Sequence, residues 1–183
     1  MNHLKKASGR YMYHLCLFAL IVLSAVSCQN DDEVLTNPIV EEFKADTGID
    51  ATWVPDMTLL NTAEGWQGSG DYPGVDDWAT ATIPAGLDLY GGLPGQSEYY
   101  TIDQTLIDAD TMQVPYWESL QVLAHPTFGY RPYVGIFDLN QETTVVISRT
   151  LANPQHGSGN AWQIYVENFT TDLTILDTIT LQN

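Results

Sequence analysis

The chain has 183 residues, of which 23 are acidic and six basic, so its formal net charge is −17 and its pI is near 4.1. A surface this acidic repels phosphate backbones and anionic lipid headgroups, which excludes nucleic acid as a partner.

The N-terminus has the pattern of an export signal. Lys5, Lys6 and Arg10 precede an apolar run of 12 residues, 15–26, which is too short to span a bilayer core about 30 Å thick. It ends in the sequence AVSC at residues 25–28, and this combination is typical of a secretory signal peptide. The cleavage site resembles a bacterial lipobox, with Ala25 where leucine is usual. The resemblance implies that Cys28 is lipidated and becomes the first residue of the mature protein.

Residues 28–33, CQNDDE, form an acidic stretch directly behind this cysteine. It resembles the export signals of surface lipoproteins in Bacteroidetes-type bacteria. We therefore expect residues 1–27 to be removed, residues 28–36 to act as a tether, and lipid on Cys28 to hold the protein at the outer membrane, exposed on the cell surface. Each buried CH₂ of the lipid contributes about 0.8 kcal/mol to this anchoring. The alternative is a secreted protein cut elsewhere.

Removal of residues 1–27 takes away three basic residues and no acid, which leaves 3 − 23 = −20 charges. The remaining bases are Lys44, Arg131 and Arg149, so an anionic ligand has only the two arginines and backbone amides to meet it. Neither cysteine stays free for an intrachain disulfide, because Cys16 leaves with the signal and Cys28 carries lipid. Residues 37–183 are predicted to form one domain that is stabilised by its core.

The elements of this domain follow in chain order. Residues 37–48 predict a short helix, because Asn37 can cap it, Pro38 suits its first turn and Gly48 suits its C-terminal end. Residues 51–60 favour an edge strand and 61–77 a long loop rich in Gly and Asp. Residues 82–92 favour a turn and a strand that ends in paired glycines, and 95–101 a loop.

The C-terminal half is dominated by strands. Residues 117–124 fit a helix or a strand equally well at this length. Four strands are predicted after them, over residues 131–139, 143–150, 161–169 and 173–181. The predicted fold class is α+β, a single β-rich and mainly antiparallel domain with one or two short helices.

The sequence predicts no metal site and no cofactor. His125 and His156 are the only histidines after residue 27, and they are not in a metal-binding spacing. Residues 108–113 begin like a calcium loop but lack the Gly at the sixth position and the Glu at the twelfth. An exposed acidic turn is the favoured interpretation there.

Four segments occur in an order that carries a family resemblance: IPAGLDLYGG at 83–92, GQSEYYT at 95–101, YVGIFD at 133–138 and NPQHGSGNAWQIYV at 153–166. Together they cover roughly residues 82–181 and resemble the ADP-ribosyltransferase-like superfamily, especially the tuberculosis-necrotizing-toxin branch of NAD glycohydrolases. On this resemblance the Gly-rich loop feeds a strand in which Gln163 takes the position of the functional glutamine. Where the family has an arginine in its first motif, this chain has Leu89, or Asp88 if the alignment shifts by one.

The resemblance implies NAD as a substrate, with Gln163 and Tyr100 as catalytic residues. The ligand-binding residues that it implies are Tyr90, Gly157 and Gly159, and Arg131 and Arg149 are added as the two arginines that remain after residue 27. Cleavage of the glycosidic bond of NAD⁺ passes through an oxocarbenium-like state, and a glutamine can orient a ribose hydroxyl or a water there without adding charge. Arg131 and Arg149 are the candidates to bind phosphate, although their positions do not match the arginines of the family.

Two other interpretations stay open. The aromatic residues of the first half of the domain, with carboxylates nearby, also suit a platform that binds glycan, and the chain could equally be a non-catalytic surface lipoprotein that binds protein. Gln163 could simply face solvent on its strand. Arg149 could be a surface ion-pair partner, and His156 a polar turn residue.

Overall fold

The computed structural model describes residues 36–153 and 155–183, which belong to one compact unit. The predicted signal peptide, Cys28 and all of the tether but its last residue lie outside these residues. Within the described part, no helix has the length and apolar character needed to cross a membrane.

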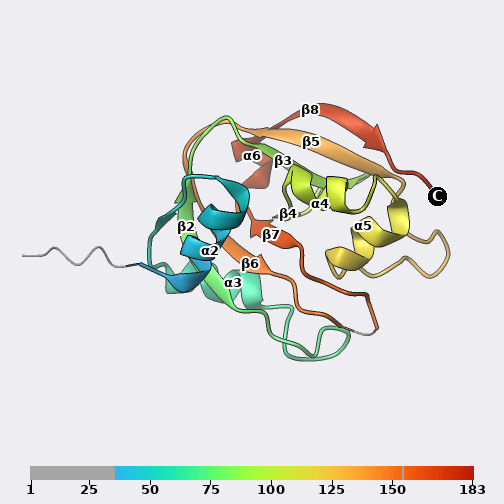
Figure 1. The fold of residues 1–183 in the computed structure, drawn as a ribbon, viewed down its shortest axis with the longest axis horizontal. Helices are drawn as coiled ribbons and strands as arrows, with labels where there is room; N and C mark the ends of the chain where they lie inside the picture. The colour runs from blue at the N-terminus through green and yellow to red at the C-terminus, as the bar shows by residue number, and fades with distance from the viewer. Residues whose placement is uncertain (1–35, 154) are drawn as a thin grey trace, which may run out of the picture. The chain divides into compact units, whose positions relative to one another are not determined.

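Two antiparallel sheets make up the domain (Figure 1). The larger has the order β1-β2-β6-β7-β4, with bounds Thr52–Trp53, Trp78–Ile83, Thr143–Arg149, Trp162–Tyr165 and Tyr99–Tyr100. The smaller has the order β3-β5-β8, with bounds Asp88–Leu93, Tyr133–Leu139 and Leu173–Thr180. The four strands predicted in the C-terminal half correspond to β5, β6, β7 and β8.

Five short helices accompany the sheets in the described residues: α2 (Pro38–Thr47), α3 (Met57–Glu64), α4 (Asp103–Asp108), α5 (Gln113–Ser119) and α6 (Phe169–Asp172). The predicted class, an α+β domain with mainly antiparallel sheets, is confirmed. The number of helices is higher than the one or two expected, because three of them are too short to show a clear apolar period.

Helix α2 forms as the sequence predicts. The Asn37 side chain accepts a hydrogen bond from the Ile39 amide at 2.9 Å, and Gly48 ends the helix in the left-handed conformation at φ 70°. Val40 and Phe43 are fully buried, so the helix packs its apolar face on the larger sheet.

The strand expected over residues 51–60 is confirmed only at its start. β1 is an edge strand of two residues, and after Pro55 the Asp56 side chain accepts hydrogen bonds from the Thr58 and Leu59 amides, each at 3.0 Å. That cap starts α3 where the strand was predicted to continue. Two capped backbone groups and the burial of Leu59 outweigh the preference of the Thr-rich stretch for an extended conformation.

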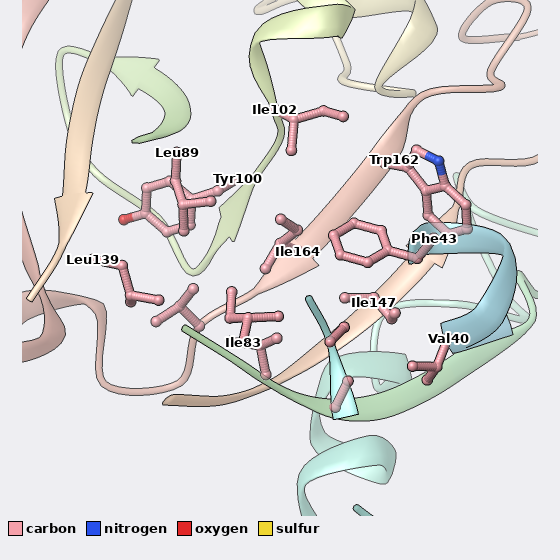
Figure 2. Packing of buried hydrophobic residues seen from close by; sticks show 14 of the residues in the cluster. Val40, Phe43, Ile83, Leu89, Tyr100, Ile102, Leu139, Ile147, Trp162 and Ile164 are labelled. Atoms are coloured by element: carbon pink, nitrogen blue, oxygen red, sulfur yellow. The ribbon is translucent and has the colours of Figure 1, made fainter. Parts of the chain in front are cut away.

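The main core lies on one face of the larger sheet and continues to the smaller sheet (Figure 2). Phe43 of α2 meets Trp162 of β7 edge to face, with 5.2 Å between ring centroids, while Leu89 and Leu139 come from the smaller sheet. The opposite face of the larger sheet carries α3, with Leu59 packed in a second cluster. Alternation along β7 therefore places Trp162 and Ile164 in the main core and directs Gln163 to the α3 side.

The two sheets are joined at one seam. Tyr90 of β3 and Thr101, directly after β4, exchange two backbone hydrogen bonds of 2.9 Å. The middle of β3 is thereby joined to the end of β4, which pairs with β7 from a distant part of the sequence.

Candidate functional site

A cavity of about 570 Å³ opens beside this seam. Its walls come from β3, the residues that lead into β4, the C-terminal end of α5 with the residues after it, the segment 150–153, and the long loop 65–77. This volume lies within the range of about 300–1,000 Å³ that is usual for small-molecule pockets. Gln163, Tyr100, Tyr90 and Arg131 all line it, so four of the residues singled out in the sequence share one cavity.

The paired glycines of β3 create the space for two of these side chains. A Cβ atom on Gly91 would lie 2.8 Å from two ring carbons of Tyr100, and one on Gly92 would lie 2.6 Å from the Arg131 guanidinium. Any other residue at these positions would push the ring or the guanidinium aside. The Gly-Gly pair thus makes room at the wall of the cavity. It does not end the strand as the sequence predicted, because β3 continues to Leu93.

Gln163 lies on β7 between two other strands and is only 9% exposed. Its side-chain nitrogen donates to an Asp76 carboxylate oxygen at 2.6 Å and lies 3.5 Å from the Ser148 hydroxyl. The expectation that an alternating strand turns this residue to solvent is wrong, because loop 65–77 covers that face of the sheet. Gln163 is instead a buried polar residue at the floor of the cavity.

The tyrosines of the cavity remain protonated at neutral pH. Burial raises the pKa of Tyr100 well above its usual value, and its hydroxyl accepts a hydrogen bond from Gln96 at 2.7 Å. Burial, followed by the charges of Asp103 and Asp88, also raises the pKa of Tyr90. These groups can therefore donate a hydrogen bond or offer an aromatic surface, but they cannot act as a general base near pH 7.

Arg131 precedes β5 and reaches over β3. Its guanidinium donates one hydrogen bond, of 3.0 Å, to the Gly95 carbonyl, while the Trp117 indole donates to the Arg131 carbonyl at 2.7 Å. Among the described residues no carboxylate lies within ion-pair distance of Arg131. The rest of its charge remains available to an anionic group in the cavity.

Arg149 lies outside the cavity and is occupied by protein groups. It forms ion pairs with Asp46 and with Glu42, the latter at 3.3 Å, and its guanidinium lies 4.5 Å from the centre of the Trp162 ring. These contacts agree with the interpretation of Arg149 as a surface ion-pair partner, because α2 supplies both carboxylates. The structure thus separates Arg149 from Arg131, and only Arg131 lines the cavity.

Gly157 and Gly159 also lie apart from the cavity lining. Both have a positive φ, and a Cβ on Gly157 would collide with Glu118 of α5, whereas one on Gly159 would collide with the Leu151 carbonyl. These glycines pack their loop against the end of α5. His156 is a turn residue of the same loop, as predicted, but it is only 5% exposed and packs on Tyr72, with 5.1 Å between ring centroids.

Two residues that sequence reasoning missed belong to the cavity, Asp76 and Gln67. The Gln67 amide donates to the Asp76 carboxylate at 3.0 Å and accepts from the Asp76 backbone at 2.6 Å. The length of the loop 61–77 was the one signal that pointed to this region.

The tryptophans do not form an exposed platform. Trp78, Trp117 and Trp162 are at most 7% exposed, whereas Trp66 is 75% exposed at the cavity. Among residues 36–153 and 155–183, no cluster of three metal-ligating side chains occurs. The arrangement of aromatic rings, one arginine and the buried amides of Gln163 and Gln121 suits an organic ligand that carries a ring and an anionic group.

Comparison with known proteins defines the class. The family model described as the Rhs1 C-terminal toxin domain matches residues 56–168. The solved structure "Rhs1-CT in complex with cognate immunity protein RhsI1" is 32% identical with a TM-score of 0.66, covering 70% of this chain and 100% of that chain. The chain therefore belongs to the family of Rhs1 C-terminal toxin domains.

A second solved structure, "Structure of Tse6 in complex with Tsi6", is 14% identical over 76% of this chain and 91% of that chain. Its TM-score of 0.37 is too low to inform the fold or the function. No curated protein matches the chain.

Proposed function

We propose that this toxin domain cleaves NAD⁺ at the bond between nicotinamide and ribose, taking up water and releasing nicotinamide, ADP-ribose and a proton. The observation that carries the proposal is the convergence of Gln163, Tyr100, Tyr90 and Arg131, from four separate segments, on one cavity of about 570 Å³. The resemblance to NAD glycohydrolases singles out Gln163, Tyr100 and Tyr90, and Arg131 is one of the two arginines that the sequence offers to an anionic ligand.

Each side chain has a role in this reaction. The amide oxygen of Gln163 accepts a hydrogen bond from a ribose hydroxyl or from the attacking water. Arg131 pairs with the diphosphate, and the aromatic rings of Tyr90 and Tyr100 border the nicotinamide. The Glu98 carboxylate, which also lines the cavity, favours the positive charge that develops on the ribose as the bond breaks.

Nicotinamide release from NAD⁺ by the purified full chain tests the proposal directly. We expect Gln163→Ala to lower the rate about 10²-fold or more, the effect of removing one transition-state hydrogen bond in an active site. Gln104→Ala is the matched control, because Gln104 is an exposed glutamine on α4 outside the cavity. The proposal is refuted if the wild-type protein releases no nicotinamide, or if Gln163→Ala is as active as the control.

We further propose that the chain is neutralised by an immunity protein of its own. The support is that the relative Rhs1-CT was solved in complex with its cognate immunity protein, RhsI1. The net charge of −17 favours a partner with a basic binding face and an association that weakens with salt. Expression of the chain in a host cell is expected to arrest growth, and co-expression of one partner gene from the source genome to restore it.

From the predicted export signal we propose that lipid on Cys28 holds the chain at the outer membrane. Labelled palmitate should enter the wild-type protein and be absent from Cys28→Ser, which should also leave the membrane fraction. Equal labelling of both proteins would exclude this anchor.

A further inference from the structure

We infer that Asp76 is the positioning residue of the cavity: it holds the amide nitrogen of Gln163, so that Gln163 offers only its amide oxygen to a ligand. The subsite at Gln163 would then accept hydrogen-bond donors, such as a sugar hydroxyl, and disfavour groups that can only accept. The catalytic consequence rests on the proposed function, whereas the orientation of the amide does not.

The Asp76 carboxylate is surrounded by donors. One oxygen accepts hydrogen bonds from the Gln163 amide at 2.6 Å and from the Gln67 amide at 3.0 Å, and the other accepts from the Leu151 backbone at 2.9 Å. Gln67 also accepts a hydrogen bond from the Asp76 backbone at 2.6 Å, so the residue is held at both ends. The position of Asp76 is therefore determined independently of any ligand.

The chemistry of the pair determines which way the amide of Gln163 points. An ionised carboxylate can only accept hydrogen bonds, so the end of the amide that faces Asp76 must be the NH₂ group. The second N–H of that group faces the Ser148 hydroxyl, 3.5 Å away and fully buried. Both donors of Gln163 thus face protein, and within the described part of the chain its amide oxygen makes no hydrogen bond.

The charge of Asp76 is not cancelled by a cation. The ion pairs of the described residues involve Lys44 and Arg149, and neither reaches Asp76. Donation of an amide proton to a carboxylate polarises the amide and makes its oxygen a better acceptor. Asp76 therefore acts on the ligand through Gln163 and makes that oxygen a stronger partner for a hydroxyl.

The contact also links two distant parts of the sequence. Asp76 lies in loop 65–77, whereas Gln163 is 87 residues further along the chain, and Leu151 follows β6. Loop 65–77 is thus attached to the sheet through one carboxylate at the point where it walls the cavity. Gln163 therefore needs this loop to complete the subsite, because the loop supplies the carboxylate that orients its amide.

The orientation can be tested without measuring activity. In NMR spectra of the full chain, the side-chain amide protons of Gln163, assigned by their absence in Gln163→Ala, should lie downfield of exposed glutamines and exchange slowly. Asp76→Asn should move these signals, whereas Asp77→Asn, which removes the neighbouring exposed carboxylate, should leave them in place. Where Asp76→Asn does not fold, Asp76→Glu serves, because its longer side chain should displace the same signals. Signals that are unmoved in the folded variant refute the inference.

The catalytic consequence is tested with a double-mutant cycle on nicotinamide release. We expect Asp76→Asn to lower kcat 10- to 100-fold with a smaller change in KM, as for an active-site group displaced by about 1 Å. In the Gln163→Ala background the same substitution should have almost no further effect. An equal additional loss in that background refutes action through Gln163. If the wild-type protein releases no nicotinamide, the proposed function fails, and the NMR result still decides the contact between Asp76 and Gln163.

Discussion

Replacement of Gly91 by alanine tests how closely the wall of the cavity is packed. Gly91 lies in the middle of β3, and an added Cβ atom would be 2.8 Å from two ring carbons of Tyr100 and 3.4 Å from a ring carbon of Phe137. Ordinary carbon contacts lie near 3.5–4.0 Å, so the Tyr100 ring would have to move by more than half an ångström.

Two opposing effects decide the sign of the change. Alanine in a strand restricts the unfolded chain more than glycine does, which stabilises by about 0.5–1 kcal/mol. Overpacking a rigid core site costs about 1–3 kcal/mol. The Tyr100 ring cannot move freely, because the residue is 2% exposed and its ring packs edge to face on Phe137, with 5.4 Å between ring centroids. Its hydroxyl also accepts a hydrogen bond from Gln96. The overpacking term is therefore the larger, and we expect a net loss of about 1–2 kcal/mol.

Chemical denaturation followed by tryptophan fluorescence measures this loss as a lower midpoint with an unchanged m-value. Gly74→Ala is the matched control, because its φ is not positive and its added Cβ would meet only one atom, in Leu151, at 3.9 Å. A Gly91→Ala protein as stable as the wild type, or more stable, would refute the packing argument.

Three further predictions concern the rest of the domain. Arg149→Met should lower the free energy of unfolding by about 0.5–1.5 kcal/mol, because the partly exposed ion pair with Asp46 and the contact with the Trp162 ring are lost. Nicotinamide release should be unchanged, and a large loss of activity would contradict the placement of Arg149 outside the cavity. Asn37→Ala should cost about 1 kcal/mol in thermal or chemical unfolding, because the cap of α2 is lost, and no change would show that the cap is not needed. Burial raises the pKa of Tyr99 and Tyr116 above the unfolded value of 10.0, so their contribution to stability is complete below pH 10 and falls as the pH rises further. In an alkaline titration the phenolate absorbance of these tyrosines should therefore appear together with unfolding, and ionisation without unfolding would contradict this.

The sequence predicted those elements that are defined by local chemistry. Asn37, Pro38 and Gly48 mark both ends of α2, and the β-branched and aromatic runs mark the four strands of the C-terminal half. It failed where local signals competed. Residues 51–60 have the composition of a strand, yet Asp56 caps α3 inside them, and α4 spans only six residues, too few for an apolar period to appear.

The candidate site was predicted in part. Gln163, Tyr100, Tyr90 and Arg131 were singled out, and the structure brings them to one cavity, whereas Arg149, Gly157 and Gly159 serve packing elsewhere. The sequence did not indicate that only one of Arg131 and Arg149 would line the cavity, since that depends on which arginine pairs with the carboxylates of α2. Asp76 was missed because its partner is 87 residues away.

The sequence by itself therefore determined the acidic character of this protein, its fold class and most of its strands. Each of these depends on composition or on contacts between residues close together in the chain. Only the tertiary structure decided that β3 joins the end of β4 beside β7 and that loop 65–77 closes the face of the sheet that carries Gln163. These arrangements depend on hydrogen bonds and packing between segments that are distant in the sequence, and such contacts cannot be predicted from residue spacing along the chain.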